Sequence, residues 1–261
     1  MKDLTKGKES RLILEFAIPM LLGNVFQLLY NVVDSIIVGK FIGKQALAAV
    51  GSSFPIIFTL ISLVIGVGMG ATIIIAQYFG AKEIDKIKRT IDTLLIFLFF
   101  ASIIISVLGI FFSDDIFRLI KLPEDVLPLA KQYLNIYFGG IIMMFGFSGT
   151  SAILRGLGDS KTPLFFLVIA TIINIILDIV FVVVLNMGIE GVAIATVISQ
   201  AGAFFTAAIY LNKTHELINI GFRKFVFDRD IFRKSVRIGF PVGFQQAFVA
   251  LSMIAMYWLV N

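Results

Sequence analysis

Long stretches without a charged side chain constrain this chain more than any other feature. A helix that crosses the hydrocarbon core of a bilayer needs about 20 mainly apolar residues. Seven intervals reach that length, and only two of them contain a charge; they cover residues 16–39, 45–81, 93–113, 132–154, 162–189, 191–212 and the stretch after Arg237, 238–261. Closed barrels show short alternating segments instead. The sequence therefore predicts an all-α integral membrane protein with seven transmembrane helices.

The composition agrees with a bilayer environment. Of the 261 residues, 59% are hydrophobic and 15% are charged, whereas soluble domains carry roughly 25% charged residues. This balance excludes an ordinary soluble domain and a disordered chain. The chain has no cysteine, so disulfides, thiolate metal sites and cysteine nucleophiles are excluded as well.

The second interval, 45–81, is longer than one perpendicular crossing of the bilayer needs. This helix is either strongly tilted or begins in the membrane interface around Pro55.

Basic residues predict the orientation. Seventeen of the 22 Lys and Arg residues lie in four segments: the N-terminal tail, the loop after the second span, the loop after the fourth and the connector after the sixth. These segments alternate with poorly charged loops, and basic loops stay on the cytoplasmic side. We expect a multi-pass protein of the cell membrane with a cytoplasmic N-terminus. The net charge of +5 then reflects topology, and nucleic acid is not an expected partner.

Polar residues inside the first span predict a hydrated cavity. Asn24, Gln27, Asn31 and Asp34 are spaced three, four and three residues apart, which places them on one face of a helix. An Asp at the centre of a transmembrane helix costs about 2.5–3.5 kcal/mol and needs a partner, water or a proton. The alternative is that the amides only hold neighbouring helices together.

A second acid occurs in the fifth span. Asn174 and Asp178 are four residues apart on one helix face, and Thr196 lies in the sixth span. Two carboxylates, an amide and a hydroxyl form an oxygen-rich set. Such a set can bind a monovalent cation such as Na⁺, or hold a proton on one Asp that is buried beside a like charge. No cofactor is expected; the coupling ion would be H⁺ or Na⁺.

Other motifs in the sequence are weaker evidence of function. The segment RGLGDSKT at residues 155–162 is like a phosphate-binding loop, but Ser160 stands where that motif has Gly before the Lys, so ATP-driven transport is not expected. No predicted span contains His or Cys, which argues against an intramembrane enzyme. Gly66 and Gly70 have the small-xxx-small spacing that allows close helix approach; we interpret them as a packing surface or a flexible hinge.

Four blocks of the sequence resemble one family. They are IPMLLGNVFQLLYNVVDSIIVGKFIGKQALAAVG, GATIIIAQYFGAK, ILRGLGDSKTP and NIILDIVFV, and they are similar to blocks of the multidrug and toxic compound extrusion (MATE) family. The resemblance implies a twelve-helix antiporter of two six-helix lobes around a central cavity. Asp34, Asn174, Asp178 and Thr196 match that family's amino-lobe site for a cation or proton. Ser151 stands where some members have an Asn, and with Gln27 and Asn31 it is a candidate for lining the cavity.

The resemblance also implies a division of the chain. Residues 1–11 would form a cytoplasmic tail, 12–212 the amino-terminal six-helix lobe, 213–236 a cytoplasmic connector and 237–261 the first helix of a second lobe. The segments FAIPMLLGNVFQ and IGFPVGFQQAFV, which open the first and seventh spans, are modestly alike and support a repeat. The rest of a carboxy-terminal lobe is missing.

The leading hypothesis is a secondary antiporter that exports small, cationic, apolar drugs in exchange for H⁺ or Na⁺. The alternative is a lipid-linked oligosaccharide flippase of the same superfamily, which often carries basic residues in its spans. No predicted span has a Lys or Arg at its centre, and this disfavours the flippase.

Overall fold

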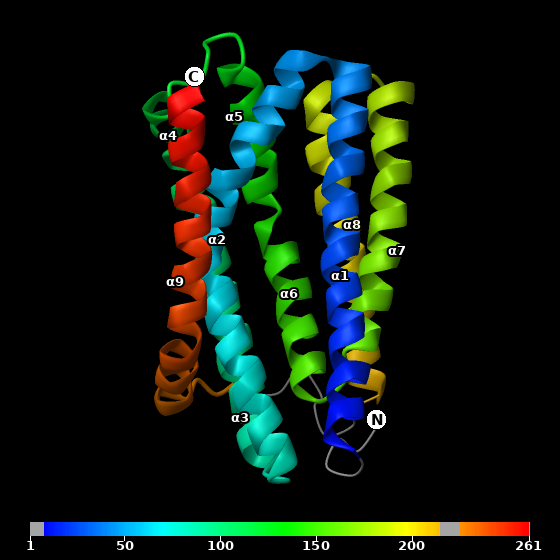
Figure 1. Cartoon of the computed structure of the whole chain (residues 1–261), viewed down its shortest axis with the longest axis vertical. Helices are drawn as coiled ribbons and strands as arrows, with labels where there is room; N and C mark the ends of the chain where they lie inside the picture. Colours follow the sequence, from blue (N-terminus) through cyan, green and yellow to red (C-terminus); the bar gives the residue numbers. More distant parts are fainter. Residues whose placement is uncertain (1–7, 215–224, 261) are drawn as a thin grey trace.

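The fold is a bundle of helices that run along one long axis (Figure 1). The computed structural model describes residues 8–214 and 225–260, and no strand occurs in these ranges. The elements in chain order are α1 Glu9–Ile37, the π-helix η1 Val38–Ile42, α2 Lys44–Gly80, α3 Ile84–Phe111, α4 Ser113–Leu119, α5 Leu127–Gly139, α6 Ile141–Gly156, α7 Lys161–Asp178, the π-helix η2 Ile179–Val184, α8 Gly188–Thr214 and α9 Arg229–Val260.

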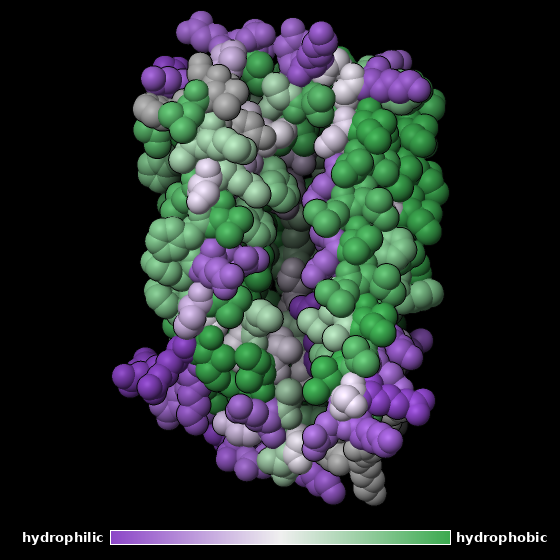
Figure 2. All heavy atoms as spheres, viewed as in Figure 1, coloured by the Kyte–Doolittle hydropathy of each residue, from purple (hydrophilic) through white to green (hydrophobic). Residues whose placement is uncertain are grey.

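Six helical segments are long and apolar enough to cross a membrane, and the bent pair α5 and α6 makes a seventh. The prediction of a seven-span, all-α membrane protein is therefore confirmed. Large apolar side chains such as Leu28, Phe100 and Phe165 are more than half exposed, and Figure 2 shows hydrophobic residues over most of the middle of the visible face. A bilayer is the solvent that such a surface requires.

The fourth span differs from the prediction of one helix over 132–154. The helix starts at Leu127, and α5 and α6 meet at an angle of 51° at Gly140. Gly140 lies directly against the side chain of Val197 in α8, where a Cβ atom would clash. The pair Gly139 and Gly140 lowers the cost of the break, so the kink lets α5 and α6 both pack on α8.

Several helices extend beyond the uncharged intervals. Helix α2 is continuous from Lys44 through Pro55 to Gly80. At 1.5 Å per residue α2 is about 55 Å long, and it must tilt or project from the hydrocarbon layer. Helices α3 and α9 start at Ile84 and Arg229, before the uncharged intervals that begin at 93 and 238, because their charged first turns lie outside the apolar layer.

The core is formed by α2, α3, α5, α6 and α8. The largest side chains that are almost fully buried include Ile75, Ile91, Leu134, Ile153 and Leu211. In contrast, α1 and α7 lie together on the outside of this core (Figure 1). Only four residues of α1 are buried, and they are Pro19, Tyr30, Asp34 and Ile37.

Helix α9 packs on α2 through small residues, as the spacing of Gly66 and Gly70 indicated for a packing surface. A Cβ atom on Gly66 would lie 2.6 Å from the carbonyl oxygen of Gly239 and 2.7 Å from the Cα of Gly243. A Cβ on Gly70 would meet the carbonyl oxygen of Ser235. The two backbones are thus in direct contact, which small residues at the helix interface allow.

The connections rich in Lys and Arg all lie at one end of the bundle. The start of α1, the turn between α2 and α3 and the turn between α6 and α7 share the end at which α8 stops and α9 begins (Figure 1). Segments η1, α4 and η2 lie at the opposite end. Of the connector predicted for 213–236, residues 215–224 lie outside the described ranges.

Candidate functional site

Three helices bring the four polar residues predicted from the sequence into the bundle interior. Asp34 lies on α1, Asn174 and Asp178 lie on α7, and Thr196 lies on α8. Their exposed fractions are 6%, 0%, 0% and 3%. The side chains of Asp34 and Asp178 are within hydrogen-bonding reach of each other. Two acids 144 positions apart in the sequence therefore form one buried pair.

Most polar atoms of this pair lack a hydrogen-bond partner. Oδ1 of Asp34, both carboxylate oxygens of Asp178, and Oδ1 and Nδ2 of Asn174 are buried with no partner among the described residues. Two ionised carboxylates cannot bond to each other, since both are acceptors only. Orphaned acceptors are costly in a low-dielectric interior. A shared proton or a bound cation would supply the charge that these oxygens need.

The chemistry of the donor set limits what it can hold. It offers oxygens from two carboxyl groups, an amide and a hydroxyl, and no group of three His, Cys, Asp or Glu side chains converges anywhere in residues 8–214 and 225–260. Soft or imidazole-rich transition-metal sites need such groups. A hard monovalent cation such as Na⁺, or a proton, fits the oxygens present.

Tyr30 is a member of the site that the sequence analysis missed. Its hydroxyl donates a hydrogen bond of 3.0 Å to Oγ1 of Thr196, and both residues are buried. Tyr133 of α5 lies within electrostatic reach of both Asp34 and Asp178. The available signal was the position of Tyr30 four residues before Asp34, which puts both side chains on one face of α1.

Both acids lie where an α-helix changes to a π-helix. Asp178 is the last residue of α7 and is followed at once by η2, and Asp34 lies one turn before η1. π-helical turns are rare and occur frequently at functional sites. The two acidic helices thus share an unusual backbone geometry on the same side of the carboxylate pair.

A hollow lies beside α1 on the visible face of the bundle (Figure 2). Figure 2 shows it between the side formed by α2 and α9 and the side formed by α1 and α7, with hydrophilic residues along its border. Along α1, Asn24 and Gln27 are exposed, Asn31 is half-buried and Asp34 is buried. The polar face of α1 therefore passes from an open surface to the buried acids.

Ser151 is buried, but the structure does not bring it to the carboxylate pair. It lies five residues before the end of α6, near the turn that joins α6 to α7. Asp178 is at the far end of α7, about 25 Å along that helix from the same turn. Oγ of Ser151 has no hydrogen-bond partner in the described part of the chain.

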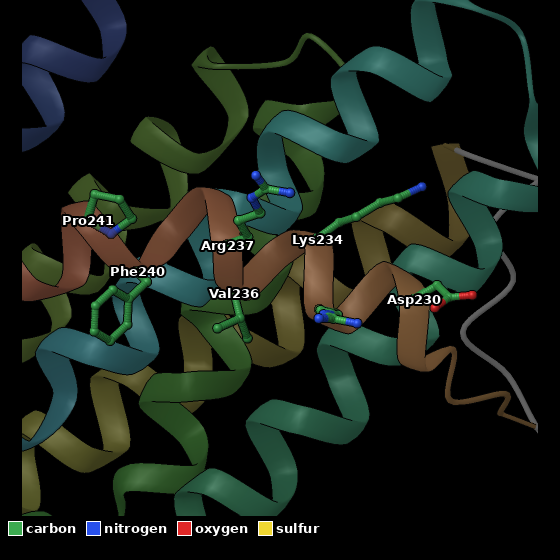
Figure 3. Close-up of a pocket in the computed structure, with 7 residues that line it drawn as sticks. Asp230, Lys234, Val236, Arg237, Phe240 and Pro241 are labelled. Atoms are coloured by element: carbon green, nitrogen blue, oxygen red, sulfur yellow. The ribbon is translucent and has the colours of Figure 1, made fainter.

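A separate hollow of about 820 Å³ lies on the outer side of α9 (Figure 3). All its lining residues come from the first four turns of that helix and include Arg233, Lys234, Arg237 and Phe240. It belongs to the basic end of the bundle and is distinct from the acidic pair.

Known proteins are similar to this chain over most of its length. The family profile described as MatE matches residues 19–180. A curated protein of Bacillus subtilis (strain 168), named probable multidrug resistance protein YoeA, is 37% identical over 253 residues, which cover 94% of this chain and 55% of that protein. A protein of Shewanella oneidensis named FAD transporter is 28% identical and covers 84% of this chain and 50% of its own length.

A solved structure shares the fold. It is described as the outward-facing conformation of a multidrug resistance MATE family transporter of the MOP superfamily, with a TM-score of 0.87 and 29% identity over 95% of this chain and 55% of that chain. These proteins are transporters and not enzymes. The present chain spans about half the length of the curated relatives it matches.

Proposed function

Because the chain belongs to the MatE family, we propose that it is the amino-terminal lobe, with the first helix of the second lobe, of a secondary antiporter. The antiporter exports organic cations or drugs across the cell membrane in exchange for H⁺ or Na⁺. The observation that carries the proposal is the buried pair of Asp34 and Asp178, whose oxygens lack partners. A multidrug resistance protein among the relatives supports the drug-export part.

The pair can couple ion binding to movement of α1. With both carboxylates ionised, Asp34 on α1 and Asp178 on α7 repel each other in a medium of low dielectric. A proton or Na⁺ between them removes that repulsion and favours docking of α1 against α7. Pro19, inside α1, removes one backbone hydrogen bond and is the point at which α1 would flex.

The hollow beside α1 would receive the cargo. Asn24, Gln27 and Asn31, on the polar face of α1, would supply polar contacts to it. The basic end of the bundle would face the cytoplasm, with the N-terminus inside. The relatives are almost twice as long as this chain. Their additional length is enough for a second lobe, which would close the cavity from the other side.

The test compares ion-driven efflux in variants of the two-lobe protein. A fluorescent organic cation is loaded into vesicles, and its transport is started with a pH gradient or, separately, with a Na⁺ gradient. Asp34→Asn and Asp178→Asn should abolish the dependence on the coupling ion. Asp125→Asn, at an exposed position, is the matched control and should behave like the unaltered protein. Unchanged ion dependence in Asp34→Asn contradicts the proposal.

One relative justifies an additional arm of this assay. Because a protein with 28% identity is named FAD transporter, FAD is offered as a second cargo under the same gradients. Efflux of FAD without efflux of organic cations would contradict the proposed substrate class. It would not contradict the proposed ion site.

A further inference from the structure

We propose that the start of α9 binds an anionic phospholipid, with the lipid phosphate in the hollow of Figure 3 and an acyl chain along the exposed face of the same helix. The inference rests on the side chains of α9 and does not depend on the acidic pair. The charged residues that line the hollow are Asp230, Arg233, Lys234 and Arg237.

The hollow has an excess of positive charge. It is lined by three basic side chains and one carboxylate, and all four residues are exposed. Within residues 8–214 and 225–260 none of the four forms an ion pair. Arg can bind two phosphate oxygens through parallel hydrogen bonds, and Lys binds phosphate as a point charge. The excess charge favours a phosphate without a compensating cation, as in phosphatidylglycerol, over a zwitterionic headgroup.

The hollow also crosses the boundary between the charged and the apolar part of α9. Arg237 is the last charged side chain of the sequence, and the uncharged stretch 238–261 starts directly after it. Phe240 and Pro241 form the apolar end of the lining, and Figure 3 shows them further along the helix than the basic side chains. A bilayer has the same division between charged headgroups and hydrocarbon. The hollow therefore matches an amphipathic ligand.

A row of phenylalanines continues from the hollow along α9. Phe240, Phe244 and Phe248 are four residues apart, and the successive ring centroids are separated by 5.6 and 4.7 Å. Each of the three is about half exposed. Arg233 and Arg237 precede the row by seven and three residues, so the basic groups and the rings lie on one face of the helix. This row would carry the acyl chain of a lipid whose phosphate lies at the two arginines.

The segment before α9 favours a lipid over free phosphate. Phe225, Val226 and Phe227 are more than 40% exposed, and they lie at the end of the bundle where the basic connections gather (Figure 1). Exposed apolar residues beside Lys and Arg are typical of segments that lie in the headgroup region of a membrane. Free phosphate gains nothing from these apolar surfaces, whereas a phospholipid does.

The experiment measures binding of phosphatidylglycerol to the chain in neutral detergent by native mass spectrometry. Arg237→Gln should raise the dissociation constant about fivefold, the contribution of one basic residue near an anionic lipid, and Arg233→Gln should act alike. Arg229→Gln is the matched control, because Arg229 is the first residue of α9 and does not line the hollow. Its dissociation constant should stay unchanged. Equal weakening by Arg229→Gln would show a diffuse effect of charge and would overturn the inference.

Two other ligands test the lipid chemistry. Phosphatidylcholine with the same acyl chains should bind more weakly, because its quaternary ammonium compensates the phosphate charge. Inorganic phosphate should not displace phosphatidylglycerol, because it has no acyl chain. Phe244→Ala interrupts the row of phenylalanines and should weaken both lipids by the same factor. Equal affinity for the two lipids, displacement by inorganic phosphate, or full affinity in Phe244→Ala would overturn the inference.

The second lobe is the competing occupant of this face. The same titration on the two-lobe protein separates it from a lipid. Phosphatidylglycerol binding that Arg237→Gln weakens there supports the lipid site. Absence of binding would mean that the second lobe covers the row of phenylalanines, and would overturn the inference. None of these measurements involves Asp34 or Asp178, so the proposed function is tested separately.

Discussion

Two helix contacts in this molecule differ in the groups that form them. Helix α9 meets α2 through Gly66, Gly70, Gly239 and Gly243, with backbone against backbone. Helix α1 meets α7 and α8 through a carboxylate pair and a hydroxyl bond, in addition to apolar contacts with leucines of α7. The first contact depends on shape alone, whereas the second depends on whether charge is present between the acids.

This difference indicates which contact can respond to an ion. Close packing of glycines has no titratable group, so its strength does not change with pH or Na⁺. Orphaned acids in a low-dielectric interior gain most from a counter-charge. We therefore expect α9 to remain with α2 while α1 changes its docking, and the following predictions test that contrast from the largest effect to the smallest.

The glycine contact should be intolerant of side chains at one position and tolerant two residues away. Gly66→Leu forces a side chain into the backbone of α9 and should lower the free energy of unfolding by about 3 kcal/mol, as overpacking does. A Cβ atom added to Gly68 would meet nothing within 4 Å, so Gly68→Leu should change the free energy of unfolding little. Thermal unfolding of both variants in detergent measures the difference. Equal losses would show that α9 does not depend on this close approach.

The acidic contact should become more stable when one acid is neutralised. Asp178→Asn removes the repulsion with Asp34 and one buried charge, and should raise the free energy of unfolding by about 2 kcal/mol. The gain should shrink as the pH falls, because a proton then neutralises the pair in the unaltered protein. Unfolding curves across pH provide the measurement. A loss of stability at every pH would mean that the carboxylate makes a contact of its own.

The start of α9 is also held to α3, independently of the glycines. Oδ1 of Asp228 accepts hydrogen bonds from the backbone N–H groups of Asp230 and Ile231 at 3.0 and 3.1 Å, and its own N–H donates to Oγ1 of Thr93. Asp228→Ala should cost about 1 kcal/mol, the usual value of a helix cap. Arg89→Ala removes only the ion pair at 3.7 Å and should cost less. If Arg89→Ala proves the more damaging, the ion pair and not the cap holds α9.

A surface ion pair away from both contacts gives the change in unfolding free energy expected for an exposed charge pair. Lys131 and Asp114 are 2.7 Å apart, and both side chains are more than 40% exposed. Lys131→Ala should change the free energy of unfolding by less than about 1 kcal/mol and leave ion-driven efflux unaltered. A larger change would show that exposed charges contribute enough to obscure the contrast.

The intervals between charges were sufficient to predict the spans and the acids within them. A buried Asp is expensive in any membrane helix, so Asp34 and Asp178 stand out in a sequence that is otherwise apolar. Tyr30 did not stand out, because a tyrosine is common in apolar helices and its value here depends on a partner 166 positions away. Pairing of that kind is decided by how α1 lies against α8, which no local pattern contains.

The bend between α5 and α6 escaped prediction for a related reason. The interval 132–154 is predicted as one helix because it contains no charged residue. The break at Gly140 depends on Val197 of another helix, and nearby glycines such as Gly146 and Gly149 are passed without a break. Ser151 was assigned by resemblance to a family position; its distance from the acids became visible only with the arrangement of α6 and α7.

The π-helical turns beyond Asp34 and Asp178 have a consequence for timing. A π-turn contains one more residue than an α-turn and is rare in proteins, and we expect η1 and η2 to open more often than the α-helices before them. Amide protons in Val38–Ile42 and Ile179–Val184 should then exchange with solvent sooner than those in the preceding turns. Each acid would then border the segment of its helix that opens first. The two helices could open locally beside the site without unfolding along their whole length.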